Sequence, residues 1–129
     1  MVLKQLLSNK AINTVKKGLL TEQFAKEYLQ RKGLVFIANN FYCRRGELDL
    51  IMRDGDTLVF IEVKYRKGSH FGGAIAAITP SKINKIKQSI VFYLHQAGLN
   101  EYHTPCRIDV ITLQGNINHP HVNWLKNAI

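Results

Sequence analysis

Asp49, Glu62 and Lys64 are the three residues whose types and spacing best suit metal-assisted chemistry, with twelve residues between the two acids. Glu62 and Lys64 interrupt LVFIEVK (58–64), whose first four residues are all apolar, as is typical of a strand covered on both faces. Burying an unpaired charge in such a strand costs several kcal/mol in order of magnitude. One explanation is an edge strand whose end carries a surface Glu–Lys pair. The other is a carboxylate that binds a divalent metal beside an ammonium that stabilises anionic charge.

The sequence around Asp49 favours the second explanation. DGD (54–56) predicts a tight turn between two strand segments, residues 47–53 and 57–66. If these segments pair antiparallel around the turn, Asp49 and Glu62 come to lie nearly opposite each other. Neighbouring carboxylates repel each other unless a cation lies between them. Oxygen ligands of this kind suit Mg²⁺ or Mn²⁺, so the hairpin predicts a metal site fit for cleaving a phosphodiester.

Alternation along a strand places Glu62 and Lys64 on the same face. In the preceding segment, the same alternation places Leu48 and Leu50 on one face and Asp49 on the other.

The net charge of the chain favours a polyanionic partner. Eighteen Lys and Arg against nine Asp and Glu give +9, an excess typical of proteins that bind DNA or RNA. No stretch approaches the roughly 18 apolar residues of a membrane span, and the N-terminus has only brief apolar patches, unlike a signal peptide. We therefore expect a cytoplasmic protein with no membrane partner, folded as one domain over residues 1–129.

Basic residues near the acidic pair are candidates for contacts with nucleic-acid phosphates. They are Arg44, Arg45, Arg66, Lys67, Lys82 and Lys85. For each of them, a solvated surface charge is the alternative. Tyr42, Tyr65 and Phe71 could stack on bases, although core packing also explains each of them. Such contacts favour backbone and shape over base sequence.

The first helix is predicted over residues 21–32, from an apolar stripe at helical spacing. Thr21 is the expected N-cap and Gly33 the expected end. Glu22 would lie at the edge of the buried stripe. Residues 1–18 are predicted to form a basic arm or a short helix.

The remaining elements predict an α/β domain with a mixed sheet, in the order α-β-β-β-α-β. Residues 34–38 and 106–113 read as strands, and a second helix begins at the Thr79 N-cap and ends at Gly98. Its expected core stripe is Ile83, Ile86, Ile90 and Leu94.

Asp49, followed after twelve residues by EVK (62–64), resembles the PD-(D/E)xK nuclease motif, with Leu48 where a proline is expected. Most of the chain also resembles the YraN-like family of uncharacterised bacterial proteins. The matching segments are EQFAKEYL (22–29), GELDLIM (46–52), VFIEVKYR (59–66), FGGA (71–74), SKINKIKQSIVFYL (81–94), CRIDVI (106–111) and NWLKNA (123–128).

This resemblance implies a restriction-endonuclease-like fold, similar to archaeal Holliday-junction resolvases. Its αβββαβ core has a mixed central sheet flanked by helices. The resemblance also implies that Asp49 and Glu62 bind the metal and that Lys64 is the catalytic lysine. Glu22 matches an acidic residue on the first helix of resolvase-like relatives, where it adds a contact to the metal or to bound water. Many members have a glycine directly before that acid, whereas Thr21 stands here.

Two more residues match positions near the site of this fold. Glu47 belongs to the family's GE-x-D pattern and could be an outer ligand or a supporting acid. Gln88 stands where some nucleases of the fold carry a helix glutamine, and a solvent-facing residue is the alternative.

The resulting hypothesis is a Mg²⁺- or Mn²⁺-dependent endonuclease that hydrolyses phosphodiesters, with DNA favoured over RNA and with branched or repair intermediates as candidate substrates. Two alternatives remain open. One is a nucleic-acid-binding module of the same fold without catalysis, and the other is an RNA-directed nuclease. Related resolvases act as dimers, which suggests a homodimer by analogy.

Overall fold

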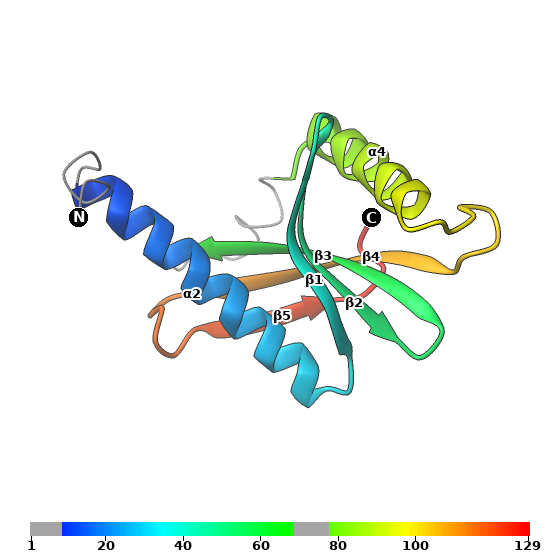
Figure 1. Ribbon diagram of the computed structural model, residues 1–129. Coiled ribbons are helices and arrows are strands. Elements are labelled where there is room, and N and C mark those ends of the chain that lie inside the picture. The colour runs from blue at the N-terminus through cyan, green and yellow to red at the C-terminus, as the bar shows by residue number, and fades with distance from the viewer. Residues whose placement is uncertain (1–8, 69–77) are drawn as a thin grey trace, which may run out of the picture.

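A computed structural model describes residues 9–68 and 78–129 of the chain. The elements are α2 (Asn9–Arg31), β1 (Val35–Cys43), β2 (Gly46–Asp54), β3 (Thr57–Arg66), α4 (Pro80–Gln96), β4 (Cys106–Gln114) and β5 (His121–Leu125) (Figure 1). The strands form one sheet in the order β1-β2-β3-β4-β5. Neighbouring strands are antiparallel except for β3 and β4, which are parallel. The predicted αβββαβ core and mixed sheet are confirmed, and β5 is an added strand.

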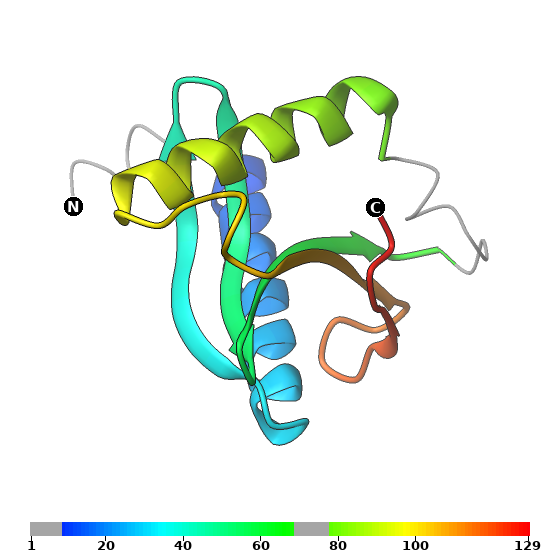
Figure 2. The ribbon, with the colours of Figure 1, turned by 90° about the vertical axis from the view of Figure 1, so that its right-hand side faces the viewer.

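The two helices cover opposite faces of the sheet (Figures 1 and 2). The core on the α2 side contains Ala25, Leu29, Leu34, Leu50, Met52, Val59, Ile61, Ile111 and Leu113. The core on the α4 side contains Leu48, Ile51, Leu58, Phe60, Ile86, Ile90, Leu94 and Ile108. β3 supplies alternate residues to both cores, as expected for a central strand covered on both faces. Within the described ranges, neither helix is long and apolar enough to cross a bilayer.

Helix α2 begins earlier than predicted. It starts at Asn9, so Thr21 lies inside the helix, where its Oγ1 donates a hydrogen bond to the Gly18 carbonyl at 3.0 Å. The predicted N-cap is therefore wrong, because a threonine hydroxyl can also bond back to the preceding turn. Residues 9–18 are helical, whereas residues 1–8 lie outside the described ranges. The predicted end is confirmed by Gly33, whose φ of +98° suits glycine.

Helix α4 begins as predicted. Thr79 accepts a hydrogen bond from the Lys82 backbone amide at 3.2 Å, and Pro80 follows as the first helical residue. Ile86, Ile90 and Leu94 are buried, whereas Ile83 is only partly buried. The core stripe is thus confirmed for its last three members.

The hairpin between β2 and β3 has the register that the sequence predicts. Paired residues run from Asp54 opposite Thr57 to Leu50 opposite Ile61. Gly55 adopts a φ of +60° in the turn, a conformation that glycine enters without steric cost. One further step of this register places Asp49 opposite Glu62.

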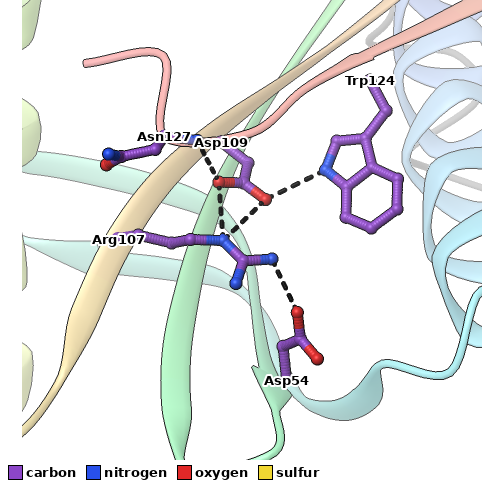
Figure 3. A network of polar contacts seen from close by, with 5 residues as sticks. All are labelled: Asp54, Arg107, Asp109, Trp124 and Asn127. Carbon is purple, nitrogen blue, oxygen red and sulfur yellow. Dashed lines mark hydrogen bonds and ion pairs between the residues drawn. The ribbon is translucent and has the colours of Figure 1, made fainter.

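A buried carboxylate fastens the C-terminal part of the chain to β4 (Figure 3). Asp109 is fully buried. It accepts hydrogen bonds from Arg107 Nε at 3.0 Å, from Trp124 Nε1 at 2.9 Å and from the Asn127 amide at 2.8 Å. Arg107 Nη2 also lies 3.0 Å from Asp54 Oδ2, as an ion pair without the alignment of a hydrogen bond. Asp109 is therefore a structural residue, paired with Arg107.

Replacing Asp109 by Ala should lower the free energy of unfolding by roughly 3–5 kcal/mol, because Arg107 and Trp124 would lose a buried partner. Asp54→Asn is the control, since it weakens only the outer ion pair and should cost about 1 kcal/mol or less. Urea unfolding of both variants measures the difference. Equal costs would contradict the structural role of Asp109.

Candidate active site

Strands β2 and β3 separate where the acidic residues begin. Their pairing ends at Leu50 and Ile61, although β2 starts at Gly46 and β3 continues to Arg66. The Oδ2 atom of Asp49 accepts the Val63 backbone amide at 3.0 Å. Beyond the last paired residues, a side-chain oxygen of β2 thus accepts a hydrogen bond from a backbone amide of β3. We call this opening between β2 and β3, marked by Asp49 and Val63, the fork.

A local distortion of the ladder between β1 and β2 lies beside Asp49. Asn39 pairs with Leu50 and Phe41 with Leu48, but the described ladder does not pair Asn40 with Asp49. Asn40 has a φ of +50°, in the left-handed region that asparagine enters more readily than most residues. The alternation of side chains is broken at this point.

The break corrects one prediction from the sequence. Leu48 packs in the core on the α4 side and Leu50 in the core on the α2 side, so they do not share a face. Simple alternation fails where the ladder between β1 and β2 is irregular, next to the unpaired Asn40 with its positive φ.

Glu62 is buried in the middle of the sheet. It lies on the same face of β3 as Leu58 and Phe60, which belong to the core on the α4 side. The residue is only 3% exposed, and β3 lies between β2 and β4. The edge-strand explanation for the Glu–Lys pair is therefore wrong.

Two ammonium groups approach the same oxygen of Glu62. Lys82 Nζ, from the first turn of α4, lies 3.1 Å from Glu62 Oε1. Lys64 Nζ, from β3 itself, lies 3.9 Å from this oxygen. The predicted proximity of Glu62 and Lys64 is confirmed, and Lys82 is closer still.

Burial sets the proton affinities of the site. It raises the pKa of Asp49, against the opposing effects of the Val63 amide and the two lysines. Burial and then repulsion from Asp49 raise the pKa of Glu62 to about 7, even though Lys82 and Lys64 favour its charged form. Burial and the neighbouring Lys82 lower the pKa of Lys64. The two carboxylates therefore share a place where their negative charges are poorly compensated.

Glu22 approaches the fork from the α2 side. It is half-buried and forms a side-chain hydrogen bond with Asn40. Burial raises the pKa of Glu22, and repulsion from Asp49 and Glu47 adds to this effect. The structure thus brings Glu22 near Asp49, while Lys82 and Lys64 approach Glu62 from the other side. Glu47 is exposed beside this group.

The remaining predicted residues occupy different places. Gln88 lines a surface hollow with Arg45, Val91, Phe92 and His95, a set that includes none of the acids at the fork. Arg44 and Arg45 form the exposed turn between β1 and β2, and Arg66 and Lys67 are exposed at the end of β3. Lys85 is exposed one turn after Lys82.

Of the residues proposed to stack on bases, Tyr42 is strongly exposed, at 68%. Tyr65 packs against the core on the α2 side and donates a hydrogen bond to the Gly115 carbonyl. Phe71 lies outside the described ranges.

Sequence reasoning missed the role of Asn40. The only local signal was Asn39-Asn40 after an apolar segment, which read as the end of a strand. Its bond to Glu22 joins β1 to α2, between residues far apart in the sequence.

Comparison with known sequences gives the family. Residues 21–113 match a family described as "Uncharacterised protein family UPF0102". The chain belongs to this family. A UPF0102 protein of Colwellia psychrerythraea is 61% identical over 121 residues, which cover 94% of each chain. A UPF0102 protein of Aliivibrio salmonicida is 45% identical over 113 residues, which cover 88% of this chain and 90% of that protein. A UPF0102 protein of Neisseria gonorrhoeae is 42% identical over 112 residues, which cover 87% of this chain and 93% of that protein.

The match confirms the resemblance to the YraN-like family. The part of this UPF0102 protein that it covers includes Glu22, Asp49, Glu62, Lys64 and Lys82.

The donor set at the fork suits a hard divalent cation. Within residues 9–68 and 78–129, no three Asp, Glu, His or Cys side chains form a ready metal-binding group. Mg²⁺, however, is often held by one or two carboxylates together with water and substrate phosphates. Asp49 and Glu62 supply two such carboxylates in this UPF0102 protein, and their mutual repulsion would be relieved by a cation.

Glu62→Gln should stabilise the metal-free protein at pH 8. Folding raises the pKa of Glu62 from its ordinary 4.5 to about 7, so the folded protein binds this proton more tightly. Stability is therefore lost as the pH rises from about 4.5 to about 7. The substitution removes this loss and should raise the free energy of unfolding at pH 8 by on the order of 2 kcal/mol, with little effect at low pH.

Urea unfolding in a chelator, repeated across this pH range, measures the effect. Glu101→Gln, at an exposed position, is the control and should leave the pH dependence unchanged. Parallel pH profiles for wild type and Glu62→Gln would show that Glu62 is not held in an unfavourable charged state.

Proposed function

We propose that this UPF0102 protein is a Mg²⁺- or Mn²⁺-dependent endonuclease that hydrolyses phosphodiester bonds in DNA, in the cytoplasm of the cell. The observation that carries the proposal is the fork, where the buried carboxylate of Glu62 and the half-buried carboxylate of Asp49 lie together with the ammonium groups of Lys64 and Lys82. The acids suit a divalent cation, and the ammonium groups suit the negative charge of a phosphate. A phosphate ester is the substrate class that best uses a divalent cation and ammonium groups at the same site.

Asp49 and Glu62 would hold the cation. When bound, such a cation polarises the scissile phosphate and lowers the pKa of a nearby water. The Val63 amide orients the Asp49 carboxylate through its 3.0 Å hydrogen bond. Because Asp49 and Glu62 come from two strands of one hairpin, the distance between the two ligands is set by the sheet and not by a loop.

Lys64 is placed to act on the reacting atoms. Its side chain is 18% exposed, so it lies at the boundary between the core and solvent. Burial and the neighbouring Lys82 lower its pKa, which makes its ammonium a better proton donor than that of an exposed lysine. Lys64 would orient the attacking water and stabilise the charge that develops as the water oxygen bonds to phosphorus and the P–O bond to the leaving group breaks.

Glu22 and Asn40 would support the site from the α2 side. Asn40 holds the Glu22 carboxylate by a side-chain hydrogen bond, and Glu22 lies close enough to Asp49 to repel it. A carboxylate in this position can accept hydrogen bonds from water bound at the fork. Its contribution would be to orient this water.

A basic surface leads away from the fork across α4. Lys82 is followed one turn later by Lys85, and the Gly46 backbone lies against the Lys85 side chain. This contact places the turn containing Arg44 and Arg45 next to α4. Together with the net charge of +9, this surface supports binding of a nucleic-acid backbone.

A nucleic-acid-binding module without catalysis is the second candidate. It is favoured by one observation, the ion pair between Lys82 and Glu62, which occupies a carboxylate that a cation would need. A binding module could keep this pair permanently.

Cleavage assays separate the two candidates. Linear, single-stranded and four-way-junction DNA, and RNA, would be incubated with the protein with and without Mn²⁺. We expect metal-dependent cleavage of DNA that falls by about a hundredfold or more in Glu62→Ala and Lys64→Ala, because each removes a group that acts on the transition state.

Lys87→Ala is the matched control, since it removes an exposed lysine from α4. Cleavage that persists in both Glu62→Ala and Lys64→Ala would contradict the active-site assignment. Binding without cleavage in any metal would favour the module, and cleavage of RNA alone would favour an RNA-directed nuclease.

The salt dependence of DNA binding tests the basic surface. Replacing both Arg44 and Arg45 by Ala should reduce the slope of log K against log salt by about two, since each phosphate contact contributes about 0.9. Arg31 and Lys32 are exposed at the end of α2, which lies at the other end of β1 from this turn (Figure 1), and they give a control double variant of equal charge. An equal loss of slope in both variants would show only a general effect of net charge.

A further inference from the structure

Lys82 stands at an unfavourable place in its own helix. It is the third residue of α4, whose first turn contains no acidic residue. The N-terminus of a helix carries partial positive charge, so a lysine there is repelled by the backbone. The local structure of α4 therefore gives no reason for a lysine at this position, and the reason must lie in what the side chain reaches.

The Lys82 side chain reaches inward to a buried oxygen. Its Nζ lies 3.1 Å from Glu62 Oε1, whereas Lys64 Nζ lies 3.9 Å away. The Lys82 side chain is 38% exposed, and that of Glu62 is 4% exposed. Lys82 thus spans from the surface to the interior on a long, flexible side chain.

Lys82 and a divalent cation would compete for the same carboxylate. Both are cations that need an oxygen of Glu62, and their charges repel each other at contact distance. Lys64 can remain in either case, because it lies farther from the oxygen and is held by the central strand. Once displaced, Lys82 would stand at the start of the basic surface, where a phosphate is the natural partner.

We propose that Lys82 holds the Glu62 carboxylate in the metal-free protein, is displaced from it when a divalent cation binds, and then contacts the phosphate of the substrate. This inference rests on the proposed function, because it concerns the same metal site. Lys82 is a positioning residue in this scheme. It partly compensates the buried carboxylate until the cation arrives and makes phosphate binding depend on metal binding.

Titration of the protein with Mn²⁺ alone, without nucleic acid, tests the competition. Isothermal calorimetry at pH 8 should show Mn²⁺ binding about fivefold tighter in Lys82→Gln than in wild type, the effect of losing one partly exposed ion pair. Lys85→Gln makes the same charge change one turn later and should stay within about twofold of wild type. Lys82→Arg should restore the weaker binding of wild type.

The outcomes separate this inference from the proposed function. Mn²⁺ binding to wild type with equal or weaker binding to Lys82→Gln would overturn the competition and leave the nuclease proposal standing. A wild type that binds no Mn²⁺ would overturn both. Lys82→Met keeps the aliphatic stem and serves as the second variant if Lys82→Gln does not fold.

The phosphate contact has its own test in the Lys64→Ala background, where DNA should remain uncleaved. Adding Mn²⁺ should increase the salt slope of DNA binding by about one when Lys82 is present. It should leave the slope unchanged in Lys82→Gln and increase it in Lys85→Gln. A slope that responds to Mn²⁺ equally in all three proteins would overturn the phosphate step.

Discussion

The carboxylate of Glu62 lies where water hardly reaches it, in the central strand of the sheet, and the site is arranged around this charge. Burial and the nearby Asp49 both oppose its ionisation, and the two lysines only partly compensate. A protein that needed Glu62 for stability alone would be better served by an apolar residue in this strand. The unfavourable charge becomes useful when a cation is brought to it.

The second condition of the site is that the sheet must open beside Glu62. β2 and β3 stop pairing after Leu50 and Ile61, and Asp49 occupies the space between them. Beside the opening, Asn40 of β1 has a left-handed conformation and is not paired with Asp49 in the described ladder. Asn40 also bonds to Glu22 on α2, so one residue joins the distortion of the sheet to an acid of the site. The regular part of the hairpin sets the distance between the acids, and the irregular part makes them accessible.

Asp109 shows the contrast between a structural and a functional buried acid. Its two oxygens accept hydrogen bonds from the Arg107 guanidinium, the Trp124 indole and the Asn127 backbone amide, and these donors compensate its charge (Figure 3). Glu62 instead has the ammonium groups of Lys64 and Lys82, of which Lys82 has the more exposed side chain. Both acids lie on strands, and their partners alone distinguish them. For the same reason, we assign Arg107, which binds Asp109, a structural role, and Lys82, which binds Glu62, a role in the site.

The sequence by itself determined what depends on near neighbours along the chain. The DGD turn set the hairpin register, Thr79 set the start of α4, and period-two alternation placed Glu62 with Lys64 on one face. The tertiary structure alone decided the opposite faces of Leu48 and Leu50, the role of Asn40 and the pairing of Lys82 with Glu62. The reason is physical: turns and caps are governed by bonds within a few residues, whereas these three features arise where α2 and α4 pack on the sheet, between groups far apart in sequence.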